Sequence, residues 1–276
     1  MNPLGVIQGR LVKKYKGRFQ AHPVGYWQEE FKLARSLDLD CIEFILDFND
    51  LKKNPLFYKN GTDEILKLIE ETSVKVRSIC ADYFMESPIH TKNSSEAKRN
   101  MTILNDLIST ADIIGVKDIV IPCVDQSSLK SESDIDLFIR RINKFLPDLD
   151  HKNINLSLET DLSPSRFLDL LDRFNSNKIT VNYDIGNSAS LGYDPIEELD
   201  AYGNKISDIH IKDRLLNGPS VVLGDGAADF ERFFLKLKNF NYKGPFIMQA
   251  YRDDEGIGIF KSQLDWIKPF LEQYND

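Results

Sequence analysis

The chain has 276 residues, a length that suits one large domain or two small ones. Apolar residues make up 42% of it and charged residues 28%, a balance that supports a large core and excludes a disordered or fibrous protein. Its 35 Lys and Arg against 43 Asp and Glu give a net charge of −8, which disfavours wrapping of a nucleic-acid backbone.

Short apolar runs alternate with longer stretches of helical period along the chain. Eight of the runs are predicted strands: residues 4–8, 41–45, 74–80, 118–122, 154–159, 179–183, 207–211 and 245–249. Between them apolar residues recur three and four positions apart, as at Met101, Leu104 and Ile108, which predicts helices with one buried face. Three predicted helices have a capping residue before the first turn: Ser163, Asp194 and Asp229. Gly61-Thr62 is predicted to be a surface turn.

The predicted strands recur about every 34 residues, the size of one strand–helix unit that feeds a parallel sheet. Eight such units predict a closed (β/α)8 TIM barrel rather than an open, doubly wound sheet. No stretch rich in Pro, Gly and Ser interrupts the series, so we expect one α/β domain over residues 1–276.

The cysteine pattern and the N-terminal residues indicate the cellular compartment of the protein. Cys41, Cys80 and Cys123 are widely spaced and form no CxxC pair, so neither a disulfide framework nor a cysteine zinc site is predicted. The first ten residues lack the apolar core of a signal peptide, and no apolar stretch approaches the ~20 residues that span a bilayer. We therefore expect a cytoplasmic protein that does not enter a membrane.

Four consecutive predicted strands end in residues that can bind a metal. They are Glu159, Asp184, His210 and Gln249. Barrel enzymes work at the C-terminal ends of their strands, and neighbouring strands lie ~4.8 Å apart, so these side chains can converge on one cation. Two carboxylates, an imidazole and an amide oxygen suit Mn²⁺, Mg²⁺ or Co²⁺, with Zn²⁺ as a further option.

The sequence resembles the xylose isomerase-like TIM barrels, a family of sugar phosphate isomerases and epimerases that includes the AP endonuclease family 2 enzymes. The resemblance spans essentially the whole chain. It rests on these segments: Gly5-Val6-Ile7-Gln8-Gly9-Arg10-Leu11, Cys41-Ile42-Glu43-Phe44, Leu158-Glu159-Thr160, Asp184-Ile185-Gly186-Asn187, His210-Ile211-Lys212-Asp213, and Leu223-Gly224-Asp225-Gly226 with Asp229-Phe230.

The resemblance implies roles for individual residues. Glu159, Asp184, His210 and the eighth-strand residue would bind one divalent metal. Glu43, after the second strand, and Asn187 would face the substrate. Lys212 would reach toward substrate oxygens or a phosphate, which makes it a predicted catalytic residue together with Glu159. A homodimer is expected only at the level of the family.

One departure from the family pattern concerns the eighth strand. In the ketose 3-epimerases of the family that position is a second Glu that shares proton transfer, whereas this chain has Gln249. An amide has no proton that titrates near pH 7. Asp82, Glu43 and His90 lie where loops could bring a substitute acid to the same mouth.

The predicted activity is a metal-dependent isomerase or epimerase for a sugar or sugar phosphate, which acts through an enediolate with Glu159 as the base. A one-base isomerase fits the residues as well. So does a dehydratase, a lyase that removes water from a keto-sugar or keto-cyclitol at the same metal site.

Recognition of a phosphate is left open by the sequence. Five cations near predicted strand ends could form a local anion pocket: Arg10, Arg18, Lys212, Arg214 and Arg252. Of these we expect Arg10 and Arg252 to contact the substrate together with Asp82 and His90. Gly224-Asp225-Gly226 lacks the spacing of a phosphate-binding loop and is predicted to be an ordinary loop before the eighth helix.

Two other classes compete with an isomerase. DNA-repair nucleases of the same family use a histidine-rich three-zinc cluster, and the four histidines here, His22, His90, His151 and His210, are poorly spaced for one. A non-catalytic barrel that binds a sugar or a metal would share the same ligands, so the sequence does not separate it from an enzyme.

Overall fold

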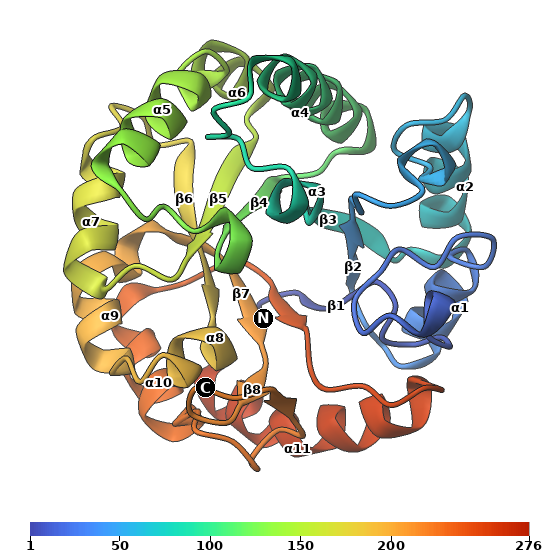
Figure 1. The fold of residues 1–276 in the computed structure, drawn as a ribbon. Coiled ribbons are helices and arrows are strands. Elements are labelled where there is room, and N and C mark those ends of the chain that lie inside the picture. Colours follow the sequence, from blue (N-terminus) through green and yellow to red (C-terminus); the bar gives the residue numbers. More distant parts are fainter. Residues whose placement is uncertain (276) are drawn as a thin grey trace.

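The computed structural model describes residues 1–275, and within them eight parallel strands close into a barrel (Figure 1). The order of the strands around the barrel is β1-β10-β7-β6-β5-β4-β3-β2. Their bounds are β1 Leu4–Ile7, β2 Cys41–Ile45, β3 Lys75–Cys80, β4 Asp118–Cys123, β5 Asn155–Thr160, β6 Ile179–Asp184, β7 Ile206–Ile211 and β10 Phe246–Met248. The predicted (β/α)8 barrel is confirmed, because each predicted strand coincides with one of these within two residues at either end.

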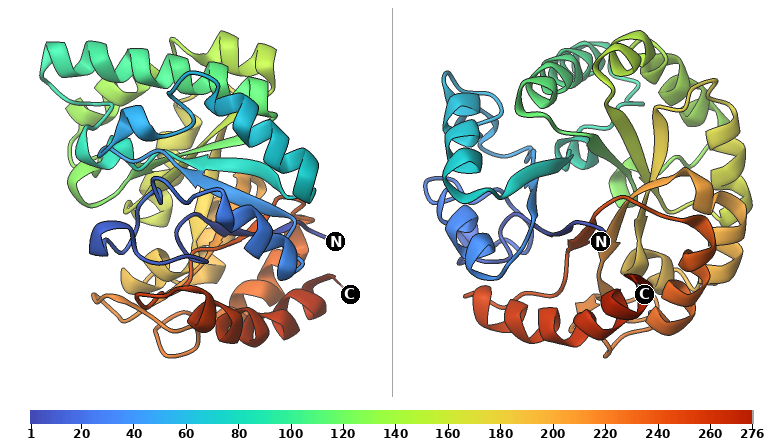
Figure 2. Two further views of the ribbon diagram at one scale, coloured as in Figure 1. Left: turned by 90° about the vertical axis from the view of Figure 1, so that its right-hand side faces the viewer. Right: turned by 180° about the vertical axis from the view of Figure 1, so that it is seen from behind.

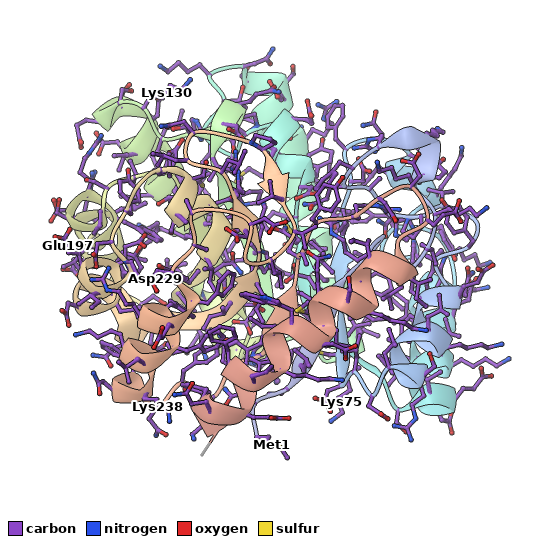
Figure 3. The ribbon with its side chains drawn as sticks, turned by 90° about the horizontal axis from the view of Figure 1, so that it is seen from below. Met1, Lys75, Lys130, Glu197, Asp229 and Lys238 are labelled. Atoms are coloured by element: carbon purple, nitrogen blue, oxygen red, sulfur yellow. The ribbon has the colours of Figure 1, made fainter. Side chains whose placement is uncertain are left out.

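Helices form the outer layer of the barrel, as the two views of Figure 2 show. Their bounds are α1 Glu29–Ser36, α2 Gly61–Thr72, α3 Tyr83–Glu86, α4 Ser94–Ile114, α5 Glu132–Ile142, α6 Leu146–Lys152, α7 Pro164–Asp172, α8 Ile185–Ser190, α9 Pro195–Tyr202, α10 Phe230–Leu237 and α11 Ile257–Asn275. The last of these, α11, lies along the outside of the barrel and ends close to Met1 (Figure 3). Both termini therefore lie at the end where the strands begin, away from the C-terminal mouth.

Two of the three predicted caps act through their side chains. Asp194 accepts hydrogen bonds from the first backbone N–H groups of α9, and Asp229 accepts one from Arg232 in α10. Ser163 stands at the N-cap position of α7, but its side chain makes no capping bond. Gly61-Thr62 is not a turn: these residues begin α2, where a Cβ on Gly61 would lie 2.0 Å from the Pro55 carbonyl oxygen.

The barrel interior is divided between apolar and polar side chains. An apolar cluster lies in the part lined by β1 to β4 and β10, next to the buried Glu43 of β2 and Ser78 of β3: Ile7, Cys41, Ile45, Cys80, Val120 and Ile247. Alternate residues of β5, β6 and β7 are polar and buried instead: Ser157, Glu159, Asn182, Asp184, Asp208 and His210. A side chain on a strand alternates between the two faces, so this inward polar row is what the barrel presents to its mouth.

A short antiparallel hairpin follows β7 and was not predicted. Its strands are β8 Asp213–Arg214 and β9 Ser220–Val221. Each of the three cysteines is a buried free thiol, and within residues 1–275 no helix is long and apolar enough to cross a bilayer.

Candidate active site

Asp184 and His210 are direct neighbours on the β6–β7 ladder, and Glu159 lies one residue before the end of the next strand, β5. One ligand atom from each of the three lies within 4.8 Å of the others, and all three residues are buried. The strand ends therefore bring together the carboxylate and imidazole groups that the sequence analysis singled out.

Gln249 joins this group from β10 through a lysine. The Lys212 ammonium donates to Asp184 Oδ2 at 3.2 Å and to Gln249 Oε1 at 3.0 Å. The backbone N–H of Gln249 donates to the Ile211 carbonyl, which fixes the end of β10 beside β7. The four predicted ligands therefore lie together at the bottom of the barrel mouth, here called the floor, and the Lys212 ammonium lies between Asp184 and Gln249.

The charges at this floor are strongly coupled. Burial, followed by the nearby Asp184 carboxylate, raises the pKa of Glu159 to about 7. Burial alone would also raise the pKa of Asp184, but Lys212, His210 and the Asn187 N–H together lower it to about 2. Two buried carboxylates in such proximity favour a bound cation, because a positive charge offsets both their desolvation and their mutual repulsion.

The donor set fits a divalent metal. Within the described residues neither ring nitrogen of the fully buried His210 has a hydrogen-bond partner: Nδ1 lies 3.9 Å from Asp184 Oδ2, and Nε2 lies 2.9 Å from Glu43 Oε1. Buried polar atoms are normally paired, so an orphaned imidazole nitrogen beside two carboxylates is the arrangement expected of a ligand. Glu159, Asp184 and His210, with the amide oxygen of Gln249, are the residues that would hold the ion.

Asn187, at the start of α8, connects the cluster to the cavity wall. Its amide donates to Glu159 Oε1, and its backbone N–H donates to Asp184 Oδ1 at 2.8 Å. Its Oδ1 accepts from Arg214 at 2.8 Å. The residue that was predicted to contact the substrate therefore also fixes the orientation of both carboxylates.

A cavity of about 480 Å³ opens above this floor at the mouth of the barrel, a size that suits a small metabolite. Five of the predicted site residues line it: Asp82, Glu159, Asn187, Lys212 and Gln249. Arg18 and Arg214, two of the cations considered for a phosphate, line it as well. Other lining residues were not predicted, among them Gln20, Asp47, Asp125 and Asp161.

Glu43 lies in the middle of β2, not after it, and its side chain occupies the barrel interior. Its Oε1 is 2.9 Å from His210 Nε2, and its Oε2 accepts from Ser78 at 2.6 Å. The residue is fully buried and does not line the cavity, so its position favours support of His210 rather than contact with a substrate.

Arg10 and Arg252 are also buried away from the cavity lining. Arg10 donates to the Ala250 carbonyl at 2.8 Å and to Gln20 Oε1 at 3.0 Å, and Arg252 donates to the carbonyls of Gly9 and Val12. These bonds join the loop after β1 to the loop after β10, so both arginines stabilise the loops that surround the mouth.

The remaining histidines lie outside the cluster. His90 is a half-buried residue of the loop between α3 and α4, and His151 lies in α6. His22 is buried, and its Nδ1 lies 2.9 Å from Gln8 Oε1. The cluster therefore contains one imidazole, that of His210, and not the set that a histidine-rich three-zinc centre requires.

A closed (β/α)8 barrel with a buried acid–histidine cluster at its C-terminal mouth has the architecture of a TIM-barrel enzyme, and the cluster could hold a metal ion. A family model described as "Xylose isomerase-like TIM barrel" matches residues 31–270, so the chain belongs to this family. The resemblance seen in the sequence motifs is confirmed.

Individual proteins similar to this chain include named epimerases. L-ribulose-5-phosphate 3-epimerase UlaE of Escherichia coli O1:K1 / APEC is 25% identical over 278 residues, which cover 96% of this chain and 94% of that protein. A structure of L-ribulose 3-epimerase has a TM-score of 0.74 at 17% identity and covers 100% of this chain and 96% of its own. The IOLI protein with a bound zinc atom has a TM-score of 0.78 at 15% identity over 99% of both chains.

Proposed function

We propose that this chain is a divalent-metal-dependent sugar epimerase in which Glu159 transfers a proton at a carbon next to a carbonyl. The observation that carries the proposal is the buried cluster of Glu159, Asp184 and His210, of which Glu159 lines a cavity large enough for a pentose or hexose. The similarity to L-ribulose-5-phosphate 3-epimerase supports the same reaction class.

A divalent ion held by Glu159, Asp184, His210 and Gln249 would polarise the substrate carbonyl and stabilise the negative charge that develops on its oxygen. The oxygen-rich donor set favours Mn²⁺, Mg²⁺ or Co²⁺ over a metal that prefers sulfur ligands. The zinc bound by the IOLI protein keeps Zn²⁺ among the ions to be tested.

The side chains of the chain supply the remaining steps. The Glu159 carboxylate takes the proton from the carbon next to the carbonyl, while Asn187 holds the carboxylate in place by the hydrogen bond from its amide. The Lys212 ammonium, which is mostly buried at the cavity wall, stabilises negative charge on a substrate oxygen. Together these groups account for formation of an enediolate.

The class of sugar is proposed as a ketose or a ketose phosphate. Three cations line the cavity and could contact a phosphate: Arg18, which is paired with Asp47, Lys212, and Arg214, which also contacts Asn187. L-Ribulose 5-phosphate, named in the similar epimerase, is the first compound to be tested, together with unphosphorylated L-ribulose.

Exchange of substrate hydrogen with solvent deuterium tests the proposal. A panel of ketoses and ketose phosphates is incubated in D₂O with Mn²⁺, Mg²⁺, Co²⁺ or Zn²⁺, and with a chelator as the control. We expect metal-dependent exchange next to the carbonyl, formation of an epimer, and loss of both in Glu159→Gln. Sugar binding without exchange would contradict the enzyme and favour a binding protein, and elimination of water would assign a dehydratase instead.

A further inference from the structure

Epimerisation at one carbon requires proton transfer on both faces of a planar intermediate, and Glu159 serves only one of them. Gln249 stands where the resemblance to the family's ketose 3-epimerases implies a second Glu, and its amide neither takes up nor gives off a proton near neutral pH. If the chain is an epimerase, another group at the cavity must carry the second proton.

Five acids besides Glu159 line the cavity: Asp47, Asp82, Glu86, Asp125 and Asp161. Asp47 is paired with Arg18, and Glu86 and Asp125 are exposed. Asp161 follows Glu159 by two residues and so lies on the same side of the mouth. Asp82 remains as an acid that is neither ion-paired within the described residues nor freely solvated.

The position of Asp82 in the barrel suits proton transfer to the face of the intermediate opposite Glu159. It follows β3, and three strands separate β3 from β7 in either direction around the barrel. The metal-binding cluster occupies the ends of β5, β6, β7 and β10, so Asp82 projects from the other half of the mouth. Figure 1 shows α3, which begins directly after Asp82, across the opening from β8.

The Asp82 carboxyl group is held in one position by two donors. Gln20 Nε2 donates to Oδ2 at 2.8 Å, and Cys80 Sγ donates to Oδ1 at 3.1 Å. Gln20 is itself fixed by Arg10, whose guanidinium donates to Gln20 Oε1 at 3.0 Å. Burial raises the pKa of Asp82 despite these two bonds, which favours the protonated acid that a proton donor must be.

We propose that Asp82 is the second proton-transfer residue of the epimerase and takes the part that Gln249 cannot perform. This inference rests on the proposed function. The C–H bond breaks as its proton passes to Glu159, and its electron pair forms the C=C bond of the enediolate while the carbonyl π pair moves to oxygen. The Asp82 O–H bond then breaks, and its proton forms a new C–H bond on the opposite face as the carbonyl returns. Glu159 ends protonated and Asp82 ionised, and exchange with water restores both.

The test follows deuterium wash-in separately for each of the two epimers in Asp82→Asn. We expect epimerisation to fall by about 10²-fold or more, while the epimer whose C–H faces Glu159 still exchanges its hydrogen with D₂O. The other epimer should lose exchange. A merely structural defect would reduce both exchange rates together, and that result, or epimerisation within about threefold of the wild type, would overturn the proposal.

Two further variants sharpen the outcome. Gln249→Glu in the Asp82→Asn background restores a second carboxylate, so we expect epimerisation to recover by at least about tenfold. Asp106→Asn removes one negative charge from the exposed face of α4, away from the cavity lining, and as the control it should leave both exchange rates unchanged. If the wild type exchanges neither epimer of any sugar in the panel, the proposed function fails. Exchange in the wild type with no effect of Asp82→Asn rejects the assignment of Asp82 alone.

Discussion

The Nε2 atom of His210 lies 2.9 Å from Oε1 of Glu43 in the barrel interior, and both side chains are fully buried. Glu43 Oε2 is in turn held by Ser78. A carboxylate on the far nitrogen of a histidine ligand fixes its ring orientation and tautomer, and loss of such a group typically lowers metal affinity 10–100-fold.

Glu43→Ala is therefore expected to weaken Mn²⁺ binding by about 10–100-fold, measured by isothermal titration calorimetry on chelator-treated protein. Glu43→Gln should have a smaller effect, because an amide oxygen 2.9 Å from His210 Nε2 keeps a hydrogen-bond acceptor beside the imidazole. Glu198→Gln is the matched control, since Glu198 is a buried carboxylate that bonds to Tyr183, Tyr202 and Ser188 away from the cluster. Equal losses in Glu43→Ala and Glu198→Gln would argue against a specific role.

Removal of a direct ligand should have a larger effect than removal of its support. His210→Ala and Asp184→Asn are each expected to leave the purified protein with well under one equivalent of divalent metal, measured by inductively coupled plasma mass spectrometry. Lys212→Met keeps the ligands and serves as the comparison. Unchanged metal content in both ligand variants would show that the assignment of the cluster is wrong.

The extent to which the sequence predicts this site depends on what each residue contacts. Asp184 and His210 are predictable because both end neighbouring parallel strands, and strand ends converge at the mouth. The inward orientation of the Glu43 side chain is not predictable from the sequence. A carboxylate that points into the barrel needs a nearby partner, and that partner, His210, is far away in the sequence. The contact of Arg10 is not predictable either. Its guanidinium donates to the carbonyl of Ala250, and a position near the end of a strand does not indicate that partner.

The role of Asp213 in holding a loop is not evident from the residues next to it in the sequence. Its carboxylate accepts hydrogen bonds from four backbone N–H groups, those of Arg214, Gly224, Gly226 and Ala228, and it is fully buried. The loop after β9 thus folds back onto the first residue of the hairpin. A Cβ on Gly226 would lie 2.0 Å from Asp213 Oδ1, which explains the glycine there and is the signal in the sequence that a close approach occurs.

Asp213→Asn is expected to lower the free energy of unfolding by about 3 kcal/mol, because the amide presents one acceptor oxygen where the carboxylate presents two to the loop. Urea unfolding followed by circular dichroism measures this change. Asp225→Asn, on an exposed position of the same loop, should change it by less than about 0.5 kcal/mol. A loss below about 1 kcal/mol for Asp213→Asn would contradict the role of the carboxylate in holding the loop.

Glu30 in α1 predicts a specific dependence of stability on pH. Burial raises its pKa from 4.5 to about 8, although the N–H groups of Gly9 and Leu11 donate to Oε1 and oppose the shift. Its other oxygen, Oε2, has no partner among the described residues. The folded protein therefore prefers the protonated acid.

Because the pKa of Glu30 is higher in the folded state, its contribution is complete below pH 4.5 and is lost as the pH rises through about 8. We expect the free energy of unfolding to fall across this interval by up to about 4 kcal/mol more in the wild type than in Glu30→Gln, whose amide oxygen still accepts from Gly9. Unfolding in urea at pH 5, 7 and 8.5 measures the difference. Parallel pH profiles for the two proteins would show that Glu30 is not the titrating group.

Gln249→Glu tests the meaning of the amide at the eighth strand. Gln249 Oε1 accepts from Lys212 at 3.0 Å, so a carboxylate there would lie beside the same ammonium and close to Asp184. A third anionic ligand should tighten Mn²⁺ binding by about tenfold or more. It should also lower the thermal stability of the metal-free protein, because the single Lys212 ammonium then offsets the charge of three neighbouring carboxylates. Thermal unfolding with Mn²⁺ and with a chelator measures both effects, and Gln126→Glu, on an exposed residue, is the control. An unchanged difference between the two melting temperatures would mean that the side chain at this position does not face the metal.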